Sequence, residues 1–304
     1  MVYTIIPDIH ADLVRLDASL ALAKGSVPVF LGDFIDANAK FLHGVPADRA
    51  VLARVKPMIE QGEALAVMGN HELNAILYHR RDAAGVPLRA HSEKNRKQHD
   101  SFLDAYGLET QEALTEGAWF LTHLPLFIDR PDLRVVHAFW DEALVTIIKE
   151  RRPDGYLREE DLAEIGREST EFGRAVKQIT SGREASLPAP YAFHDFKGEA
   201  RHEVRLAWWR DDQTWRSAAL SVPDVNELPE GDLPPEWRAA AYPHSAPRVF
   251  AGHYKMEGAP ALQHPRALCL DYPFAPCVYR WRGEQDLMPE NLILLDLPAL
   301  EPVS

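Results

Sequence analysis

Residues 64–72 read Ala-Leu-Ala-Val-Met-Gly-Asn-His-Glu, an uncharged apolar run that stops at a Gly-Asn pair. A short apolar run without charge is typical of a buried β-strand, and Gly followed by Asn is typical of the turn that ends one. We therefore expect Asn70 and His71 to lie at the carboxyl end of a strand. Open α/β sheets place their chemistry at that end. The stretch thus predicts an α/β fold and the position of a site within it.

Two upstream stretches repeat this pattern. Residues 3–7 run into Asp8-Ile-His10, and residues 27–31 run into Gly32-Asp33-Phe-Ile-Asp36. Helical spacing of apolar residues between these stretches makes them a βαβ unit, and therefore a parallel pair of strands. The three strand ends are expected to bring six polar side chains to one edge of a sheet, namely Asp8, His10, Asp33, Asp36, Asn70 and His71.

Two later strands are predicted to end at a histidine. Residues 134–136 precede His137, and residues 248–251 precede Gly252-His253. Between them the sequence changes to charged, helical segments, which predicts an inserted helical cap at about 141–200. Strand-like pieces after residue 267 are expected to complete a second sheet. The chain is therefore predicted to be one domain over 1–304, interrupted by the cap.

The composition restricts the kind of partner. A formal net charge of −13 argues against stable nucleic-acid binding and against an anionic membrane surface, since both favour basic proteins. It is compatible with a phosphorylated substrate, because bound cations can reverse a local field. Cys269 and Cys277 lack metal-type spacing and are either reduced core thiols or a hairpin disulfide. With a first strand predicted from residue 2 and no apolar run of about 20 residues, we expect a cytoplasmic protein.

The residue types at the strand ends suit two divalent metal ions held side by side. Such a pair needs a bridging carboxylate, imidazole and oxygen ligands, and open positions for water and substrate. Nitrogen and oxygen ligands without thiolate favour manganese, with iron or zinc as alternatives, over calcium. The ligands predicted for one ion are Asp8 and His10, for the bridge Asp33, and for the other ion Asn70, His137 and His253.

Asp36 and His71 remain as a carboxylate and an imidazole outside the ligand set. A carboxylate next to an imidazole favours its protonated form and orients the ring. The pair is therefore predicted to act as a general acid, with His71 donating the proton.

The ordered motifs resemble those of the calcineurin-like metallophosphoesterases, and most closely the branch of the phosphoprotein phosphatases and bacterial dinucleoside tetraphosphatases. The resemblance covers residues 1–140 and 203–281. It implies a four-layer α/β/β/α sandwich with both metals at one edge, in-line attack by metal-activated water, and protonation of the leaving oxygen by His71. The motifs that carry it are Asp8-x-His10, Gly32-Asp33-x-x-Asp36, Gly69-Asn70-His71-Glu72, His137 and Gly252-His253.

The chain departs from that branch directly after Asp36. An arginine that clamps the phosphate usually follows, whereas Ala37 and Asn38 stand here. Because an arginine fork binds phosphate through two parallel hydrogen bonds, another cation has to take this part. Arg205 is preferred because it lies in a β stretch beside Trp208, and the other candidates are Arg80, Arg81, Arg210 and Lys255.

Together these features predict a binuclear metal-dependent phosphoesterase. The expected substrate is a phosphomonoester or phosphoanhydride of a small molecule or nucleotide, because a cap can enclose a small ligand more readily than it admits a phosphoprotein. A serine/threonine protein phosphatase acting on phosphoproteins is the alternative. A non-catalytic scaffold with the same fold is a further alternative, although every ligand and acid position carries a suitable residue.

Overall fold

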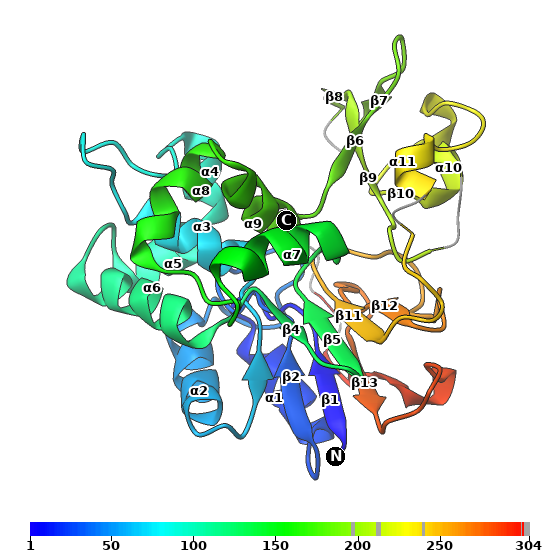
Figure 1. Ribbon diagram of the computed structural model, residues 1–304. Coiled ribbons are helices and arrows are strands. Elements are labelled where there is room, and N and C mark those ends of the chain that lie inside the picture. The colour runs from blue at the N-terminus through cyan, green and yellow to red at the C-terminus, as the bar shows by residue number, and fades with distance from the viewer. Residues whose placement is uncertain (196–197, 211–213, 239–240, 299, 301–304) are drawn as a thin grey trace.

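The computed structural model describes residues 1–195, 198–210, 214–238, 241–298 and 300, and has two mixed β-sheets at its centre (Figure 1). The order of the first sheet is β14 (Leu292–Leu294), β13 (Cys277–Trp281), β1 (Tyr3–Ile6), β2 (Val27–Phe30) and β3 (Leu65–Ala66). The order of the second is β12 (Ala267–Cys269), β11 (Arg248–Ala251), β5 (Leu133–Val136) and β4 (Phe127–Asp129).

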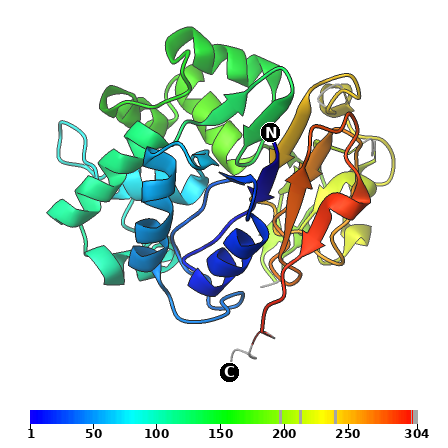
Figure 2. The same cartoon turned by 90° about the horizontal axis from the view of Figure 1, so that it is seen from below.

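Helices surround the two sheets and gather mainly on one side of them (Figures 1 and 2). Those that precede β5 are α1 (Leu13–Leu22), α2 (Asp48–Glu60), α3 (Asn70–Tyr78), α4 (Glu93–Gln98), α5 (Asp100–Tyr106) and α6 (Gln111–His123). Those that follow are α7 (Glu142–Arg151), η1 (Glu159–Asp161), α8 (Leu162–Arg167), α9 (Glu171–Ser181), α10 (Trp215–Ala218), η2 (Val225–Glu227), α11 (Pro235–Arg238) and η3 (Pro289–Asn291).

The central strands are apolar because they are buried on both faces. Ile5, Val29 and Phe30 have no exposed surface, and β1 pairs with β2 in parallel, with Ile5 opposite Val29. Parallel strands covered on both faces consist of continuous apolar runs of this kind. β2 also pairs in parallel with β3, so three consecutive strands end at one edge. The predicted α/β fold and the shared edge are both confirmed.

The predicted cap is helical only in its first part. Helices α7 to α9 occupy residues 142–181, and their residues Ile148, Ile165 and Ile179 are fully buried in the main core. The prediction of helix is wrong for the rest, which forms β6 (Glu184–Ser186), β7 (Phe193–His194) and β8 (Ala200–Arg201).

Strand β6 pairs with β9 (Glu203–Leu206), which pairs with β10 (Ala219–Leu220). Val204 and Leu206 of β9 belong to a small core that includes Trp215 and Leu228 and is separate from the main one. Burial in this second core explains why the sequence leaves helical spacing here. The strands β6 to β9 project from the body at the upper right of Figure 1.

The last strands also differ from expectation. β12 joins the second sheet as predicted, but β13 and β14 extend the first, with β13 antiparallel to β1 and Tyr3 stacked on Trp281. They cover an edge of β1 that would otherwise expose unpaired backbone groups. Cys269 and Cys277 lie in these different sheets as free, buried thiols, so the disulfide alternative is wrong. Among the described residues, no helix has the length and apolar character needed to cross a membrane.

Candidate metal centre

Asp33 lies at the middle of the predicted ligands, where β1, β2, β5 and β11 end. Its Oδ2 atom is 3.8 Å from Nε2 of His10 and 3.3 Å from Nε2 of His137. Nε2 of His10 is also 3.9 Å from Oδ2 of Asp8. On the other side, Oδ1 of Asn70 lies 2.9 Å from Nε2 of His137. Asp33 therefore faces ligand atoms on both sides, as a bridging carboxylate would.

His253 completes the second group of ligands. Its Nδ1 atom lies 2.7 Å from Oδ1 of Asn70, which in turn lies 2.9 Å from Nε2 of His137. The possible metal-ligand atoms of these three residues are therefore close together. Two groups within metal-binding reach share Asp33, one with His10 and His71 and the other with His137 and His253. With the contacts of Asp8 and Asn70, the structure brings together all six side chains predicted as ligands, and it also places His71, predicted as the acid, within metal-binding reach.

The backbone at the strand ends aims these side chains. His10, Asp33, Asp36 and His253 have φ angles of 50°, 52°, 65° and 73°, in the left-handed region that residues other than glycine rarely adopt. Such conformations cost energy and persist where surrounding contacts impose them, often at functional sites. Here the carbonyl oxygen of Asp33 accepts hydrogen bonds from the N–H groups of Ile9 and His10 at 3.0 and 2.8 Å. These hydrogen bonds between the turns after β1 and β2 therefore stabilise the conformation of both turns.

Two glycines are required by close approach of the ligands. A Cβ atom at Gly69 would lie 2.2 Å from Oδ1 of Asp33, and one at Gly252 would lie 2.0 Å from Oδ1 of Asp8. Any other residue would displace a carboxylate. This explains why glycine precedes both Asn70 and the histidine at the end of β11.

Glu72 ties two of the strand ends together. It is fully buried, and its carboxylate accepts hydrogen bonds from the N–H groups of Asp33 and Gly69, both at 2.9 Å, and of Phe34 at 2.7 Å. Burial, with the charge of Asp33 adding to it, raises the pKa of Glu72 to about 7. It acts as a support for the turns after β2 and β3, not as a ligand.

The charges of the predicted ligands, and the orientation of the His137 ring, are suited to binding divalent cations. Burial raises the pKa of Asp8 well above its usual value, and the neighbouring Asp271 and Asp33 add to the rise. Nδ1 of His137 lies 2.7 Å from the carbonyl oxygen of Leu31, to which it donates, leaving Nε2 to face the carboxylates. Burial works against protonation of His137, but Asp33 and Asp8 raise its pKa to about 10. A proton thus occupies a position suited to a metal ion, and metal binding would release it.

His71 and Asp36 form the predicted acid pair. Nδ1 of His71 lies 2.7 Å from Oδ2 of Asp36, while its Nε2 faces the cluster, 3.9 Å from Oδ2 of Asp33. Burial opposes protonation, but Asp33 and Asp36 outweigh it and raise the pKa of His71 to about 9. The pKa of Asp36 falls to about 2 against the effect of burial, through His99 and His71. The hydrogen bond to Asp36 and the charges of Asp33 and Asp36 thus favour the protonated imidazole that a proton donor needs.

Two histidines that the sequence did not indicate support this pair from behind. Nδ1 of His99 lies 2.7 Å from Oδ1 of Asp36, and Nε2 of His99 lies 3.0 Å from Nε2 of His79. Nδ1 of His79 accepts the N–H of Glu109 at 2.9 Å, so its proton is on Nε2 and is donated to His99. His99 then carries its proton on Nδ1 and donates it to Asp36. No sequence signal could have predicted this series of hydrogen bonds, because His79 and His99 are far apart in the sequence and belong to no shared motif.

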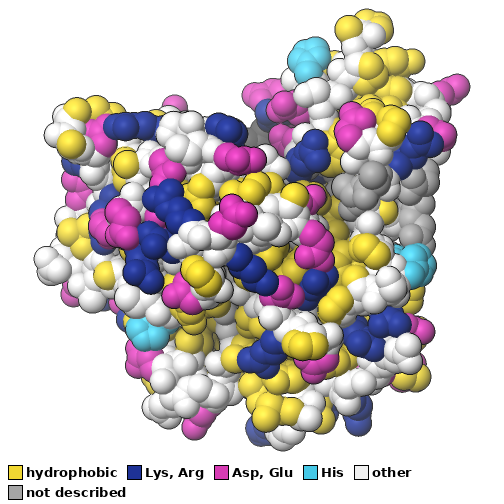
Figure 3. All heavy atoms as spheres, viewed as in Figure 1, with side chains coloured by type: hydrophobic (Ala, Val, Ile, Leu, Met, Phe, Trp, Pro, Cys, Tyr) yellow, Lys and Arg dark blue, Asp and Glu magenta, His cyan; other side chains and the backbone are white. Residues whose placement is uncertain are grey.

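The predicted phosphate-binding arginines lie in different places. Arg80 and Arg81 lie beyond the far end of α3 from His71 and pair with Glu159 and Glu109, both at 2.7 Å, so the structure does not bring them to the cluster. Figure 3 shows basic and acidic side chains side by side over the helices at its left. Arg205 pairs with Glu184 at 3.1 Å, but its charge helps to lower the pKa of His253, after the larger effect of burial.

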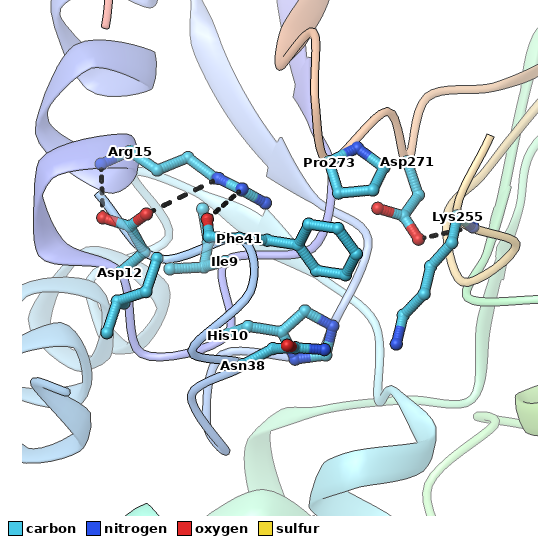
Figure 4. Close-up of a pocket in the computed structure, with 10 residues that line it drawn as sticks. Ile9, His10, Asp12, Arg15, Asn38, Phe41, Lys255, Asp271 and Pro273 are labelled. Carbon is cyan, nitrogen blue, oxygen red and sulfur yellow. Dashed lines mark hydrogen bonds and ion pairs between the residues drawn. The ribbon is translucent and has the colours of Figure 1, made fainter. Parts of the chain in front are cut away.

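Lys255 lies on the other side of the cluster. It lines a small pocket with His10, Asn38 and Phe41, and its side chain extends toward His10 and Asn38 (Figure 4). Its φ of 47° is held by a 2.8 Å hydrogen bond from its N–H to the buried carboxylate of Asp271. Its charge contributes to lowering the pKa of His10, where burial and His71 are the larger causes. An exposed ammonium group thus stands beside the predicted metal ligands.

The sequence profile described as "Calcineurin-like phosphoesterase" matches residues 1–174. The chain belongs to the calcineurin-like phosphoesterase family. It is accordingly a hydrolase, a metallophosphoesterase whose His and Asp cluster is its metal site. The match runs past residue 140, where the motif resemblance was expected to stop, which agrees with the burial of α7 to α9 in the main core.

Similar solved structures include a protein proposed to be a diadenosine tetraphosphatase, at 15% identity over 97% of this chain and 92% of that one, with a TM-score of 0.44. A protein serine/threonine phosphatase from Saccharomyces cerevisiae is 14% identical over 100% and 81%, with a TM-score of 0.45. A metallophosphoesterase from Sphaerobacter thermophilus is 23% identical over 46% and 47%, with a TM-score of 0.29. No curated protein matches the sequence.

The buried His79 makes a prediction about acid stability. Burial, followed by the nearby His99, lowers the pKa of His79 to about 4, so the folded protein keeps it neutral while the unfolded chain, at about 6.5, binds a proton. Stability is therefore lost as the pH falls from 6.5 toward 4. Relative to His79→Gln, the wild type should lose about 2 kcal/mol between pH 7.5 and pH 5. Urea unfolding of both proteins at both pH values measures this, and parallel pH dependences would contradict the assignment.

Proposed function

We propose that the chain hydrolyses a phosphomonoester or phosphoanhydride of a small molecule or nucleotide at a binuclear metal centre. The observation that carries the proposal is the position of Asp33 between His10 on one side and His137 on the other, with the hydrogen-bonded pair of Asp36 and His71 on the same edge. Manganese is the metal we expect, because the donors are carboxylate, amide and imidazole groups without thiolate. The free thiols Cys269 and Cys277 support a cytoplasmic location, because disulfides persist mainly in oxidising compartments.

The residues divide the reaction between them. Asp8, His10 and Asp33 would hold one ion, and Asp33, Asn70, His137 and His253 the other. The bound ions would supply a nucleophile from water at neutral pH and withdraw charge from the phosphate. Asp36 orients His71, whose Nε2 proton goes to the oxygen that leaves phosphorus. His99 in turn holds Asp36 as a hydrogen-bond acceptor.

The cations beside the predicted metal ligands are the candidates for binding the phosphate. We assign phosphate binding to Lys255 and Arg205. The ammonium group of Lys255 has no ion-pair partner among the described residues, and its charge contributes to lowering the pKa of His10. The charge of Arg205 contributes to lowering the pKa of His253. Arg80 and Arg81 would have to leave their glutamate partners and cross the length of α3 to serve, so they are not assigned.

Metal-stripped protein refilled with manganese tests the proposed function directly. Turnover should appear on p-nitrophenyl phosphate and on at least one nucleotide or dinucleoside polyphosphate. Asp33→Asn should lose both ions together and lower turnover at least about 100-fold, because the bridge serves both sites. Metal content and initial rates are the measurements. No turnover on any substrate with two ions bound would contradict the proposal, and a marked preference for a phosphopeptide would favour a protein phosphatase.

The role of His71 predicts a dependence on the leaving group. His71→Ala should lower kcat on an alkyl phosphate by about 100-fold or more, because an alkoxide needs a proton as it leaves. On p-nitrophenyl phosphate the loss should stay below about tenfold, since nitrophenolate needs little protonation. Steady-state kinetics on both substrates give the comparison. Equal losses on both would remove His71 from the acid role.

A further inference from the structure

Lys177 is held against α3, the helix that carries His71, by the end of α9. The carbonyl oxygen of Ile179 accepts hydrogen bonds from the N–H groups of Ala138 and Phe139, at 3.2 and 3.1 Å, in the segment that follows β5. These bonds fasten the last turn of α9 to the metal-site edge of the second sheet. Nζ of Lys177 then lies 3.5 Å from Oδ1 of Asn74 on α3.

Asn74 places this cation close to the proton donor. It follows His71 by three residues on α3, and residues three apart lie on the same face of a helix, about 5 to 6 Å between Cβ atoms. The ammonium group of Lys177 is therefore bound to a residue on the same face of α3 as His71, one helical turn along the helix.

Arg89 adds a second positive charge to the same region. Its Nη2 donates to Oε1 of Gln98 at 2.9 Å, next to His99. The Arg89 guanidinium is within electrostatic range of Asp36 and of Lys177. Burial lowers the pKa of Lys177, with Glu168 opposing this and Arg89 adding to it. The N–H of Arg89 donates to the carbonyl oxygen of Leu77 on α3 at 3.1 Å, so both half-buried cations are anchored to that helix.

Neither cation forms an ion pair in the described part of the chain, although Glu168 acts on Lys177 and Asp36 acts on Arg89 at longer range. Within the described parts of the chain, no carboxylate comes within ion-pair distance of Arg89 or Lys177, and Asp36 is already bound by two imidazoles. By contrast, Arg80 and Arg81 nearby each have a glutamate partner. Holding two partly desolvated cations together without a counter-ion is unfavourable unless an anion joins them. This arrangement therefore favours the binding of an anion beside the two cations.

We propose that Arg89, Lys177 and Asn74 form a subsite for an anionic leaving group, and that the substrate carries a second phosphate there. This rests on the proposed function. In the reaction, the oxygen of water bonds to one phosphorus atom while the bond from that phosphorus to the bridging oxygen breaks. The bridging oxygen keeps the electron pair and takes the proton of His71. The group that leaves is then a phosphate held by two cations, which favours a phosphoanhydride over a simple monoester.

Binding of two phosphonates tests the subsite without requiring turnover. Methylphosphonate occupies one phosphate position, whereas methylenediphosphonate occupies two and is not hydrolysed. Manganese-loaded protein is titrated calorimetrically with each ligand, which is equilibrated beforehand at the same free manganese concentration. The wild type should bind methylenediphosphonate more tightly. The double variant Arg89→Gln/Lys177→Met should lose about 10- to 100-fold in that affinity, since each cation makes a charge-assisted contact, and keep its affinity for methylphosphonate.

Two further variants serve as controls. Lys94→Met removes an exposed charge on α4 and should change neither affinity, while Lys177→Arg should retain most of the preference. Unfolding midpoints establish that each variant is folded. Equal affinities of the two ligands in the wild type, or an equal loss for both ligands in the double variant, would overturn the subsite. A preference for the diphosphonate in a protein that hydrolyses no phosphate would leave the subsite standing and refute the proposed function.

Discussion

Buried negative charge at Asp33 is the constraint on which the site depends. Its carboxylate is almost fully buried and faces the imidazoles of His10, His71 and His137. A buried carboxylate is costly unless cations or donors compensate it. The left-handed turns, the glycines without a Cβ and the support of Glu72 all serve to hold that charge among its ligands. The fold thus accepts local strain in order to concentrate charge at one edge.

Much of this could be read from the sequence, because motifs at strand ends report directly on geometry. Parallel strands share an edge, so Asp8, Asp33 and Asn70 had to meet once their strands were recognised. The side chains that hold Asp36 could not be found in this way. His79 and His99 lie in or beside helices, and their sequence spacing carries no motif. Only packing of the loop after α3 against α5 brings them together.

The errors of the sequence interpretation have a common physical origin. Residues 184–195 and 198–206 are rich in charged and exposed side chains, so their pattern did not reveal that β6 and β9 bury one face in a small separate core. The last strands were assigned to the wrong sheet, because strand pattern predicts that a strand exists and not which edge it will cover. Helices α7 to α9 contribute to the main core, and the backbone contacts of Ile179 help to hold Lys177 against α3.

The carboxylate of Asp33 is the group on which the proposed centre depends most, because it would join the two metal ions. Electron paramagnetic resonance of the protein loaded with two manganese ions per chain tests this directly. A carboxylate bridge places the ions close enough for their spins to couple, so we expect the spectrum of an exchange-coupled pair. Two ions per chain that give only the spectrum of isolated manganese would contradict the account, since Asp33 could not then be the bridge.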